Sequence, residues 1–168
     1  MTIAEFDHLE TAEKAALLTK CCGSQTWVNK MLEVLPAEDL VDLLESAGEQ
    51  WEACSEADWR EAFTHHPKIG DVSSLRTKFA DTAEWAAGEQ AAVGQSTDAI
   101  LQALADGNTA YEEKFGYIFI VCATGKTAAE MLTLLQQRLP NNADAEIKIA
   151  ADEQNKITQL RLQKLFIV

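Results

Sequence analysis

Apolar residues recur three and four positions apart along almost the whole chain, which is the spacing of one face of an α-helix. One such stripe follows Ser24, a residue suited to cap a helix N-terminus, and ends at Pro36, through which a helix cannot continue. A second stripe follows this proline. The two stripes consist of Trp27, Val28, Met31, Leu32 and Leu35, and of Leu40, Leu43, Leu44, Ala47 and Trp51.

Capping sequences mark the starts of further helices. An acidic residue three positions after Ser55 approximates a capping box, and it precedes a short apolar segment with Trp59 and Phe63. A full capping box, formed by Thr127 and Glu130, precedes another apolar stripe. Both sequences predict helix N-termini.

Residues 115–123 interrupt the helical spacing, because they are continuously apolar and rich in aromatic and β-branched side chains. This composition is typical of a strand. The chain has no second convincing strand to pair with it. We therefore expect a buried, partly extended segment that leads into a helix.

Together these elements predict an all-α fold. The final helix is expected from about Asp144 to Leu165, with Ile149, Ile157, Leu160 and Leu165 facing inward. A chain of 168 residues is long enough for one well-formed core, and no repeat, low-complexity tract or linker divides it. We predict a single compact domain over residues 1–168, with seven to nine helices that do not form a simple up-and-down bundle.

The composition narrows the class of function. A net charge of −13 argues against a nucleic-acid partner, because phosphate binding needs a basic surface. No stretch approaches the roughly 18 apolar residues of a membrane span, and the acidic start does not fit a signal peptide. The expected location is the cytoplasm, where cysteines stay reduced. The cysteines match no zinc spacing, so most are expected to pack in the core: Cys21, Cys22, Cys54 and Cys122.

Residues 124–127, Thr-Gly-Lys-Thr, resemble the end of a phosphate-binding loop. That loop requires a glycine five residues before Gly125, where this chain has Ile120. We therefore interpret these residues as the entrance to a helix. The chain also lacks the Gly-x-Ser-x-Gly sequence of serine hydrolases and the His-Glu-x-x-His sequence of metalloproteases.

The strongest candidate for catalytic chemistry is the pair His65 and His66, which directly precedes Pro67. Pro67 stops the helix and restricts His66 to extended geometry, from which its ring can project into a cleft. Gly70 then permits a sharp turn. Histidine is the usual proton-transfer catalyst near neutral pH. The alternative is a structural histidine whose charge complements the helix dipole.

Two further segments are candidates for ligand binding. Glu89 and Gln90 lie in an alanine-rich segment, residues 83–92, whose small side chains allow close approach of a ligand. A carboxylate beside an amide suits a heterocycle with alternating N–H and C=O groups, and the alternative is an exposed, weakly amphipathic helix. Arg161 lies among leucines of the last predicted helix. A partly buried arginine needs an anion, from either the protein or a substrate.

These residues occur in an order that resembles the family of 2-oxo-4-hydroxy-4-carboxy-5-ureidoimidazoline (OHCU) decarboxylases. His-Pro alone is a weak signal, whereas five motifs in order over nearly the whole chain are specific. The motifs are Cys21-Cys22-Gly23-Ser24 with Trp27, Ala62-Phe63 leading into His66-Pro67-Lys68-Ile69-Gly70, Gly88-Glu89-Gln90, Phe115-Gly116-Tyr117 through Cys122-Ala123, and Ile157-Thr158-Gln159-Leu160-Arg161-Leu162.

The resemblance implies an all-α homodimer that converts OHCU to (S)-allantoin, the last step from urate, without a metal or an organic cofactor. It implies that His66 is catalytic, that Glu89 and Gln90 bind the ring and ureido group, and that the backbone of residues 118–122 lines the pocket. Arg161 would bind the polar end of the substrate. The implied substrate-binding residues are Pro67, Ala86, Ala87, Gly88, Glu89, Gln90, Ile118, Phe119, Ile120, Val121, Cys122 and Arg161. Family members often have serine at the position of Ala86, so Ala86 can contribute only shape or backbone.

The implied reaction needs no cofactor, because the ring imine of the substrate can accept the electron pair that CO2 leaves behind. His66 would polarise or deprotonate the hydroxyl, or act as the proton donor, and the sequence leaves this choice open. Two other functions also stay open. One is a non-catalytic helical binding module whose acidic surface recognises a basic protein, and the other is an enzyme of the same fold acting on a different ureido or carboxylated heterocycle.

Overall fold

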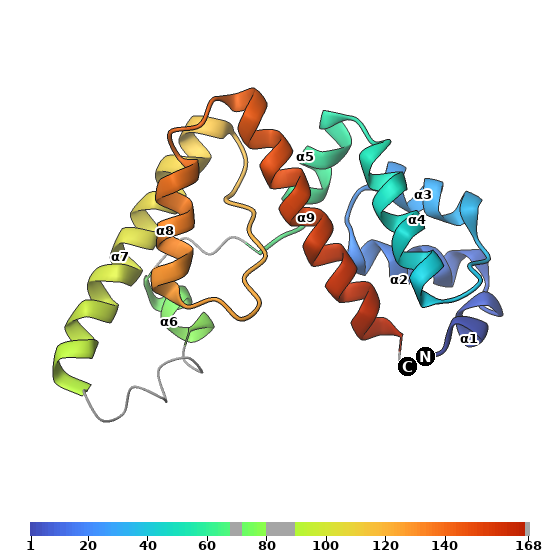
Figure 1. Cartoon of the computed structure of the whole chain (residues 1–168), viewed down its shortest axis with the longest axis horizontal. Helices are drawn as coiled ribbons and strands as arrows, with labels where there is room; N and C mark the ends of the chain where they lie inside the picture. Colours follow the sequence, from blue (N-terminus) through green and yellow to red (C-terminus); the bar gives the residue numbers. More distant parts are fainter. Residues whose placement is uncertain (68–71, 80–89, 167–168) are drawn as a thin grey trace. The chain divides into compact units, whose positions relative to one another are not determined.

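The computed structural model describes residues 1–67, 72–79 and 90–166, with the backbone alone at residues 78 and 90–97. Within these ranges the chain forms nine α-helices and no strand, which confirms the predicted all-α class and helix number (Figure 1). The chain divides into two compact units, Met1–His66 with Ile147–Val168, and Pro67–Glu146. Among the described helices, none combines the length and apolar character that a membrane crossing requires.

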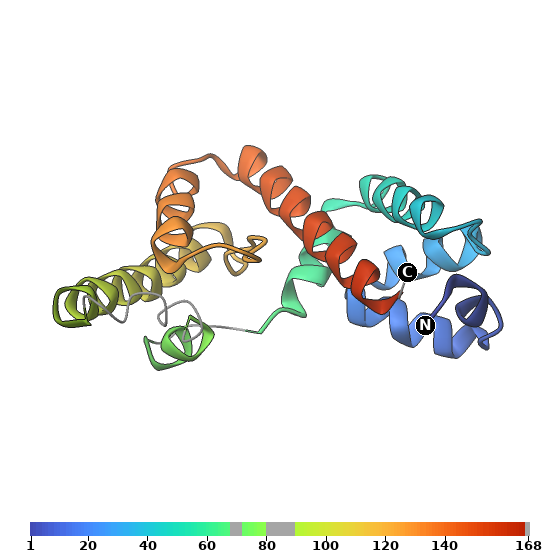
Figure 2. The same cartoon turned by 60° about the horizontal axis from the view of Figure 1, so that its bottom comes forward.

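The first unit contains five helices from the N-terminal part of the chain and most of the last helix. They are α1 (Ile3–Asp7), α2 (Thr11–Cys21), α3 (Gln25–Val34), α4 (Leu40–Glu52), α5 (Glu56–Thr64) and α9 (Ala143–Leu165). The predicted caps are present, because the Ser24 hydroxyl accepts from the backbone N–H of Trp27 at 3.2 Å and Ser55 forms a capping box with Asp58. Figure 2 shows the C-terminal part of α9 beside the helices of the N-terminal part, and the Phe6 and Phe166 rings meet edge to face.

Tryptophan side chains connect the helices of this unit. The indole N–H of Trp27 donates to the carbonyl oxygen of Ala47 at 3.0 Å, and that of Trp51 donates to Ala151 at 2.8 Å. The indole N–H of Trp59 donates to the carbonyl oxygen of Trp51 at 3.1 Å. Because a buried indole must place its N–H on an acceptor, these bonds fix how α3, α4, α5 and α9 lie against one another.

The buried face of α9 differs from the prediction. The four apolar residues expected to face inward, Ile149, Ile157, Leu160 and Leu165, are only half-buried. The buried residues of this stretch are Glu146, Ile147, Ala150, Ala151, Gln154, Thr158 and Leu162, with Glu153 at the margin. The apolar periodicity pointed to the wrong side of the helix because two residues in the middle of the true buried face, Gln154 and Thr158, are polar.

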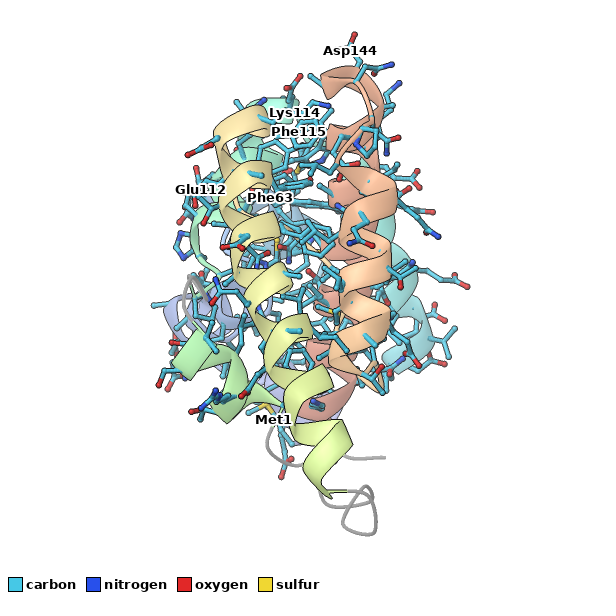
Figure 3. All side chains as sticks on the ribbon, turned by 90° about the vertical axis from the view of Figure 1, so that its left-hand side faces the viewer. Met1, Phe63, Glu112, Lys114, Phe115 and Asp144 are labelled. Atoms are coloured by element: carbon cyan, nitrogen blue, oxygen red, sulfur yellow. The ribbon has the colours of Figure 1, made fainter. Side chains whose placement is uncertain are left out.

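The second unit contains α6 (Val72–Lys78), α7 (Gln90–Phe115), α8 (Ala128–Arg138) and the first turn of α9. Figure 1 shows α7 and α8 side by side. A Cβ atom at Gly107 would lie 2.4 Å from Cδ2 of Leu135, so this glycine permits the close approach of α7 and α8. At the end of α7, marked in Figure 3 by Lys114 and Phe115, the Lys114 ammonium donates to the carbonyl oxygen of Leu139 at 2.7 Å.

An extended segment, residues 118–123, connects α7 to α8. Tyr117, Ile120 and Cys122 are buried, whereas the intervening side chains are half-buried. The chain then turns at Gly125, whose φ of 75° favours glycine, and the Thr127 capping box starts α8. As predicted, the segment interrupts the helices, is partly buried and leads into a helix, and residues 124–127 form the entrance to that helix.

Candidate active site

A cavity of about 320 Å³ opens in the first unit, at the C-terminal ends of α2 and α5 and along α9. Its volume lies within the range of small-molecule sites, roughly 300–1,000 Å³. The residues that line it are Thr19, Lys20, Gly23, Ala62, His65, His66, Gln154 and Arg161. The structure therefore brings His66 and Arg161, two of the predicted site residues, into one cavity.

His66 is placed by the end of α5. The last helical residue is Thr64, and the backbone N–H groups of His65 and His66 close the final turn on the carbonyl oxygens of Ala62 and Phe63, at 3.2 and 3.3 Å. His66 is half-buried, and its Nε2 is hydrogen-bonded to Oε1 of Gln154 on α9. His65 is exposed. The helix therefore ends before Pro67, as predicted, with His66 as the less exposed of the two histidines.

Gly23 forms the floor under the neighbouring His65 ring. A Cβ atom added at Gly23 would lie 2.3 Å from Cγ and 2.6 Å from Cδ2 of that ring. No side chain fits between the Gly23 backbone and the imidazole. The glycine of the Cys-Cys-Gly-Ser motif is therefore required by this close approach.

Arg161 is held by the C-terminus of α2. Its Nη1 donates to the carbonyl oxygen of Cys21 at 3.3 Å and lies 3.5 Å from that of Lys20. Among the described residues no carboxylate pairs with it. The guanidinium has five N–H donors, so these backbone contacts leave most of its capacity for a ligand in the cavity.

The charge of the cavity is opposite to that of the protein. The whole chain carries a net charge of −13. The cavity lining nevertheless contains Lys20, Arg161 and two histidines, and none of the described residues in it is a carboxylate. Such a local excess of positive charge attracts an anion, and a carboxylate or a comparable group is the ligand it suits.

In the second unit, a buried ion pair holds the segment of residues 118–123 in place. The Arg138 guanidinium lies 2.6 Å from the carboxylate of Glu146, with side chains 8% and 0% exposed, and its Nη1 donates to the carbonyl oxygen of Ile120 at 2.7 Å. The hydroxyl of Tyr111 and the amide of Asn141 also donate to Glu146, at 2.5 and 3.0 Å. Burial, and then the bond to Glu146, raise the pKa of Tyr111 far above its usual range. The network therefore anchors the segment at the Ile120 carbonyl.

The other predicted site residues lie outside the cavity just described. Pro67 is exposed and follows His66 directly, and residues 118–122 belong to the second unit. Residues 86–89, including Ala86, Ala87, Gly88 and Glu89, lie outside the described part of the chain. Gln90 is the first residue of α7, and its side chain lies outside the described part as well.

The sequence analysis missed three cavity residues, Thr19, Lys20 and Gln154, and it named Gly23 and Ala62 in the family motifs without assigning them to the site. It also missed Arg138, which resembles an ordinary basic residue in the last turn of a helix. For Gln154 and Thr158 a signal was available. These two polar residues lie one turn apart and continue the helix face formed by Ile147, Ala150 and Ala151. A periodicity search that counts only apolar residues does not detect them.

The cysteines are free and buried, which confirms the predicted packing role. Burial raises the pKa of the Cys22 thiol to about 12, and those of Cys21 and Cys54 to about 11. These three thiols therefore stay protonated near neutral pH and do not act as nucleophiles there. In the described ranges, no group of three or more His, Cys, Asp or Glu side chains is arranged to hold a metal ion.

Comparison with known proteins gives one consistent family. The OHCU decarboxylase family model matches residues 7–163, which spans both units. The chain is 40% identical over 147 residues to the uric acid degradation bifunctional protein TTL of Arabidopsis thaliana, covering 87% of this chain and 45% of that protein. The chain thus spans less than half the length of this relative.

Two solved structures share the fold. One is OHCU decarboxylase in the presence of (S)-allantoin, with a TM-score of 0.70 and 38% identity, covering 88% of this chain and 95% of that chain. The other is (S)-allantoin synthase, with a TM-score of 0.71, covering 99% of this chain and 54% of that one. At 20% identity the second supports the fold alone.

Proposed function

The chain belongs to the OHCU decarboxylase family, and on this premise we propose that it catalyses the decarboxylation of OHCU to (S)-allantoin, the last step of urate degradation. The observation that carries the proposal is the cavity in which His66 lies together with the positively charged side chains of Arg161 and Lys20. OHCU is an anion that must exchange protons during the reaction, and this cavity offers positive charge beside a titratable ring.

The substrate supplies its own electron sink. Its C4 carries a carboxylate and a hydroxyl, and C5, which bears the ureido group, is doubly bonded to a ring nitrogen. Cleavage of the bond between C4 and the carboxylate releases CO2, and the electron pair moves into the C4–C5 bond and onto that nitrogen. That nitrogen takes up one proton, the C4 hydroxyl gives up its proton and becomes the C4 carbonyl, and C5 gains one proton on a single face. The protein therefore needs to orient the substrate and to move protons, and no metal or organic cofactor is required.

His66 is the catalytic residue of this proposal. It accepts the proton of the C4 hydroxyl or delivers the proton to C5. Arg161 and Lys20 attract and orient the anion. Because the negative charge moves from the carboxylate onto the ring as neutral CO2 departs, a tight ion pair to the carboxylate would stabilise the ground state more than the transition state. Their contribution is therefore orientation, with the carboxylate held out of the ring plane so that its electrons overlap the imine.

The family resemblance alone supports further substrate-binding residues. Glu89 and Gln90 bind the ring and the ureido group, Pro67, Ala87, Gly88 and the backbone of residues 118–122 line the pocket, and Ala86 contributes only shape. Support comes from the family motifs that contain these residues. Glu89→Ala should lower kcat/KM roughly 10- to 100-fold, the effect of losing a charge-assisted hydrogen bond. Unchanged kinetics in Glu89→Ala and Gln90→Ala would contradict this part of the proposal.

The proposal extends to the assembly. We propose that residues 1–168 form one family domain, which the match over residues 7–163 supports, and that the protein is a cytoplasmic homodimer. Four free cysteines are consistent with a reducing compartment. Light scattering on the purified chain measures the dimer, and a monomer at micromolar concentration would contradict it.

The decisive test is a spectroscopic assay with freshly generated OHCU. The chain should accelerate its disappearance, and circular dichroism should show the (S)-enantiomer of allantoin in excess. Activity should survive exhaustive chelation, and a loss that a divalent metal restores would contradict the cofactor-free mechanism. No acceleration would favour a binding module, and turnover of a related ureido compound alone would favour an enzyme of the same fold with another substrate.

A further inference from the structure

The cavity contains a hydrogen-bonded chain of side chains that starts at the buried face of α9. Gln154 and Thr158 are 1% and 2% exposed, and they lie one helical turn apart. Burial of two polar side chains in a helix is unfavourable unless their donors and acceptors are satisfied. Their partners therefore define how each group is oriented.

The orientation of the Gln154 amide follows from Thr158. The Thr158 hydroxyl donates its one proton to the backbone carbonyl oxygen of Gln154 at 3.0 Å. The hydroxyl oxygen can then only accept, and it accepts from Nε2 of Gln154 at 3.1 Å. The amide N–H2 is thus directed to Thr158, which leaves Oε1 of Gln154 on His66.

The orientation of the amide decides the protonation of the ring. Oε1 is a carbonyl oxygen and can only accept, so Nε2 of His66 must be the donor in this bond. In the neutral imidazole the lone pair then lies on Nδ1. When the ring is charged, Nε2–H still has its acceptor, and Nδ1 is the nitrogen that gives the proton away.

We propose that Gln154, held by Thr158, is a positioning residue that keeps the catalytic ring of His66 in the Nε2–H tautomer and makes Nδ1 the nitrogen that exchanges the proton with the substrate. This inference rests on the proposed function for its kinetic consequence. The tautomer itself is a property of the protein without substrate.

The test measures the tautomer directly. The chain has three histidines, so two-bond ¹H–¹⁵N spectra of the whole ¹⁵N-labelled protein give few ring signals, which His8→Gln and His65→Gln assign. At a pH of about 8.5, where an ordinary histidine is neutral, the wild-type His66 ring should show the Nε2–H pattern. Gln154→Met, which keeps the length but removes both hydrogen bonds, should shift it towards Nδ1–H. Gln154→Glu, which keeps an acceptor, should restore Nε2–H.

The same variants are compared in the decarboxylation assay. Gln154→Met should lower kcat about 10- to 100-fold with little change in KM, the size expected when a functional histidine loses the partner that orients it. The matched control is Gln159→Met on the same helix, since the half-buried Gln159 amide donates to the carbonyl oxygen of Leu44 at 2.9 Å. It should lower the melting temperature and leave both the tautomer and kcat unchanged.

Several results overturn the inference. A wild-type ring in the Nδ1–H form does so, and so does an unchanged tautomer in Gln154→Met. Equal kinetic effects of Gln154→Met and Gln159→Met overturn its kinetic part. If Gln154→Met fails to fold, the wild-type spectrum still tests the tautomer of His66. Thr158→Val, which frees the Gln154 amide to rotate, then tests whether the amide sets that tautomer. A wild type inactive on OHCU with the Nε2–H pattern would refute the proposed function and leave the tautomer assignment standing.

Discussion

Nη1 of Arg161 on α9 donates to the carbonyl oxygen of Cys21, the last residue of α2, at 3.3 Å. The contact ties the end of one helix to another and points the guanidinium at the cavity that contains His66. Arg161 therefore has two roles: its guanidinium holds the end of α2, and it also lines the cavity. Substitutions can separate these two roles.

Arg161→Lys keeps the charge but lacks the planar fork, so it cannot hold the α2 carbonyl and a substrate anion together. We expect kcat/KM to fall about 10- to 100-fold, the effect of losing a charge-assisted hydrogen bond. Both kcat/KM and the melting temperature should be measured on one preparation. A lower melting temperature with unchanged kcat/KM per folded molecule would mean that Arg161 only caps α2.

His65 and His66 provide a matched pair, since both line the cavity at the end of α5. His66→Asn should lower kcat about 10²- to 10⁴-fold, because it removes the group that transfers the proton. His65→Asn should lower kcat by less than about tenfold, which corresponds to less than roughly 1.4 kcal/mol in activation free energy. In the wild type, kcat/KM should show a limb near neutral pH that is absent in His66→Asn. Equal losses in the two variants would refute the assignment of His66.

Gly23→Ala should destabilise the protein through one neighbour. The new Cβ would lie 2.3 Å from Cγ of His65, so the imidazole must leave its position. In a His65→Gly background both the ring and the His65 Cβ, which would lie 2.7 Å from the new Cβ, are gone, and the same substitution should be nearly neutral. Urea unfolding of the four proteins gives the coupling free energy. A cost of Gly23→Ala that persists without the His65 side chain would show that the backbone, and not this contact, requires glycine.

Breaking the buried ion pair between Arg138 and Glu146 should lower the free energy of unfolding more than breaking an exposed ion pair. Arg138→Met leaves a carboxylate with 0% exposure uncompensated, and such a loss typically costs about 3–5 kcal/mol of the free energy of unfolding. The control in the same unit is Arg76→Met, which breaks an ion pair to Asp98 at 2.8 Å between side chains 57% and 58% exposed. This pair should contribute about 1 kcal/mol or less. If both substitutions lowered the free energy of unfolding by a similar amount, the buried network would not be what stabilises the segment at Ile120.

The buried thiols should make the protein less stable at alkaline pH. Burial raises the pKa of Cys22 to about 12, above the value of about 8.5 for an unfolded chain. Above the unfolded value the unfolded chain loses this proton while the folded chain keeps it, so the free energy of unfolding falls as pH rises. The stability difference between wild type and Cys22→Ala should therefore shrink from pH 8 to 10. A difference independent of pH would show that the thiol titrates normally in the fold.

Much of the local structure was predictable because its causes are local. Ser24, Ser55 and Thr127 cap helices through hydrogen bonds to residues three positions away, so a short window of sequence contains all the information. The break before Pro67 and the extended segment before α8 have the same local origin. The candidate catalytic histidine was identified for this reason, together with the order of the family motifs.

The sequence by itself determined the all-α class, the capped starts of α3, α5 and α8, and His66 as the group with suitable chemistry. Only the tertiary structure decided what His66 meets, because its partner Gln154 is 88 positions away and no periodicity connects the two. It also decided which face of α9 is buried, since hydrogen bonding made burial favourable for Gln154 and Thr158, which hydropathy assigns to solvent. The same holds for Arg161 and Lys20, whose positive charges gather at one cavity only after α2 and α9 pack together.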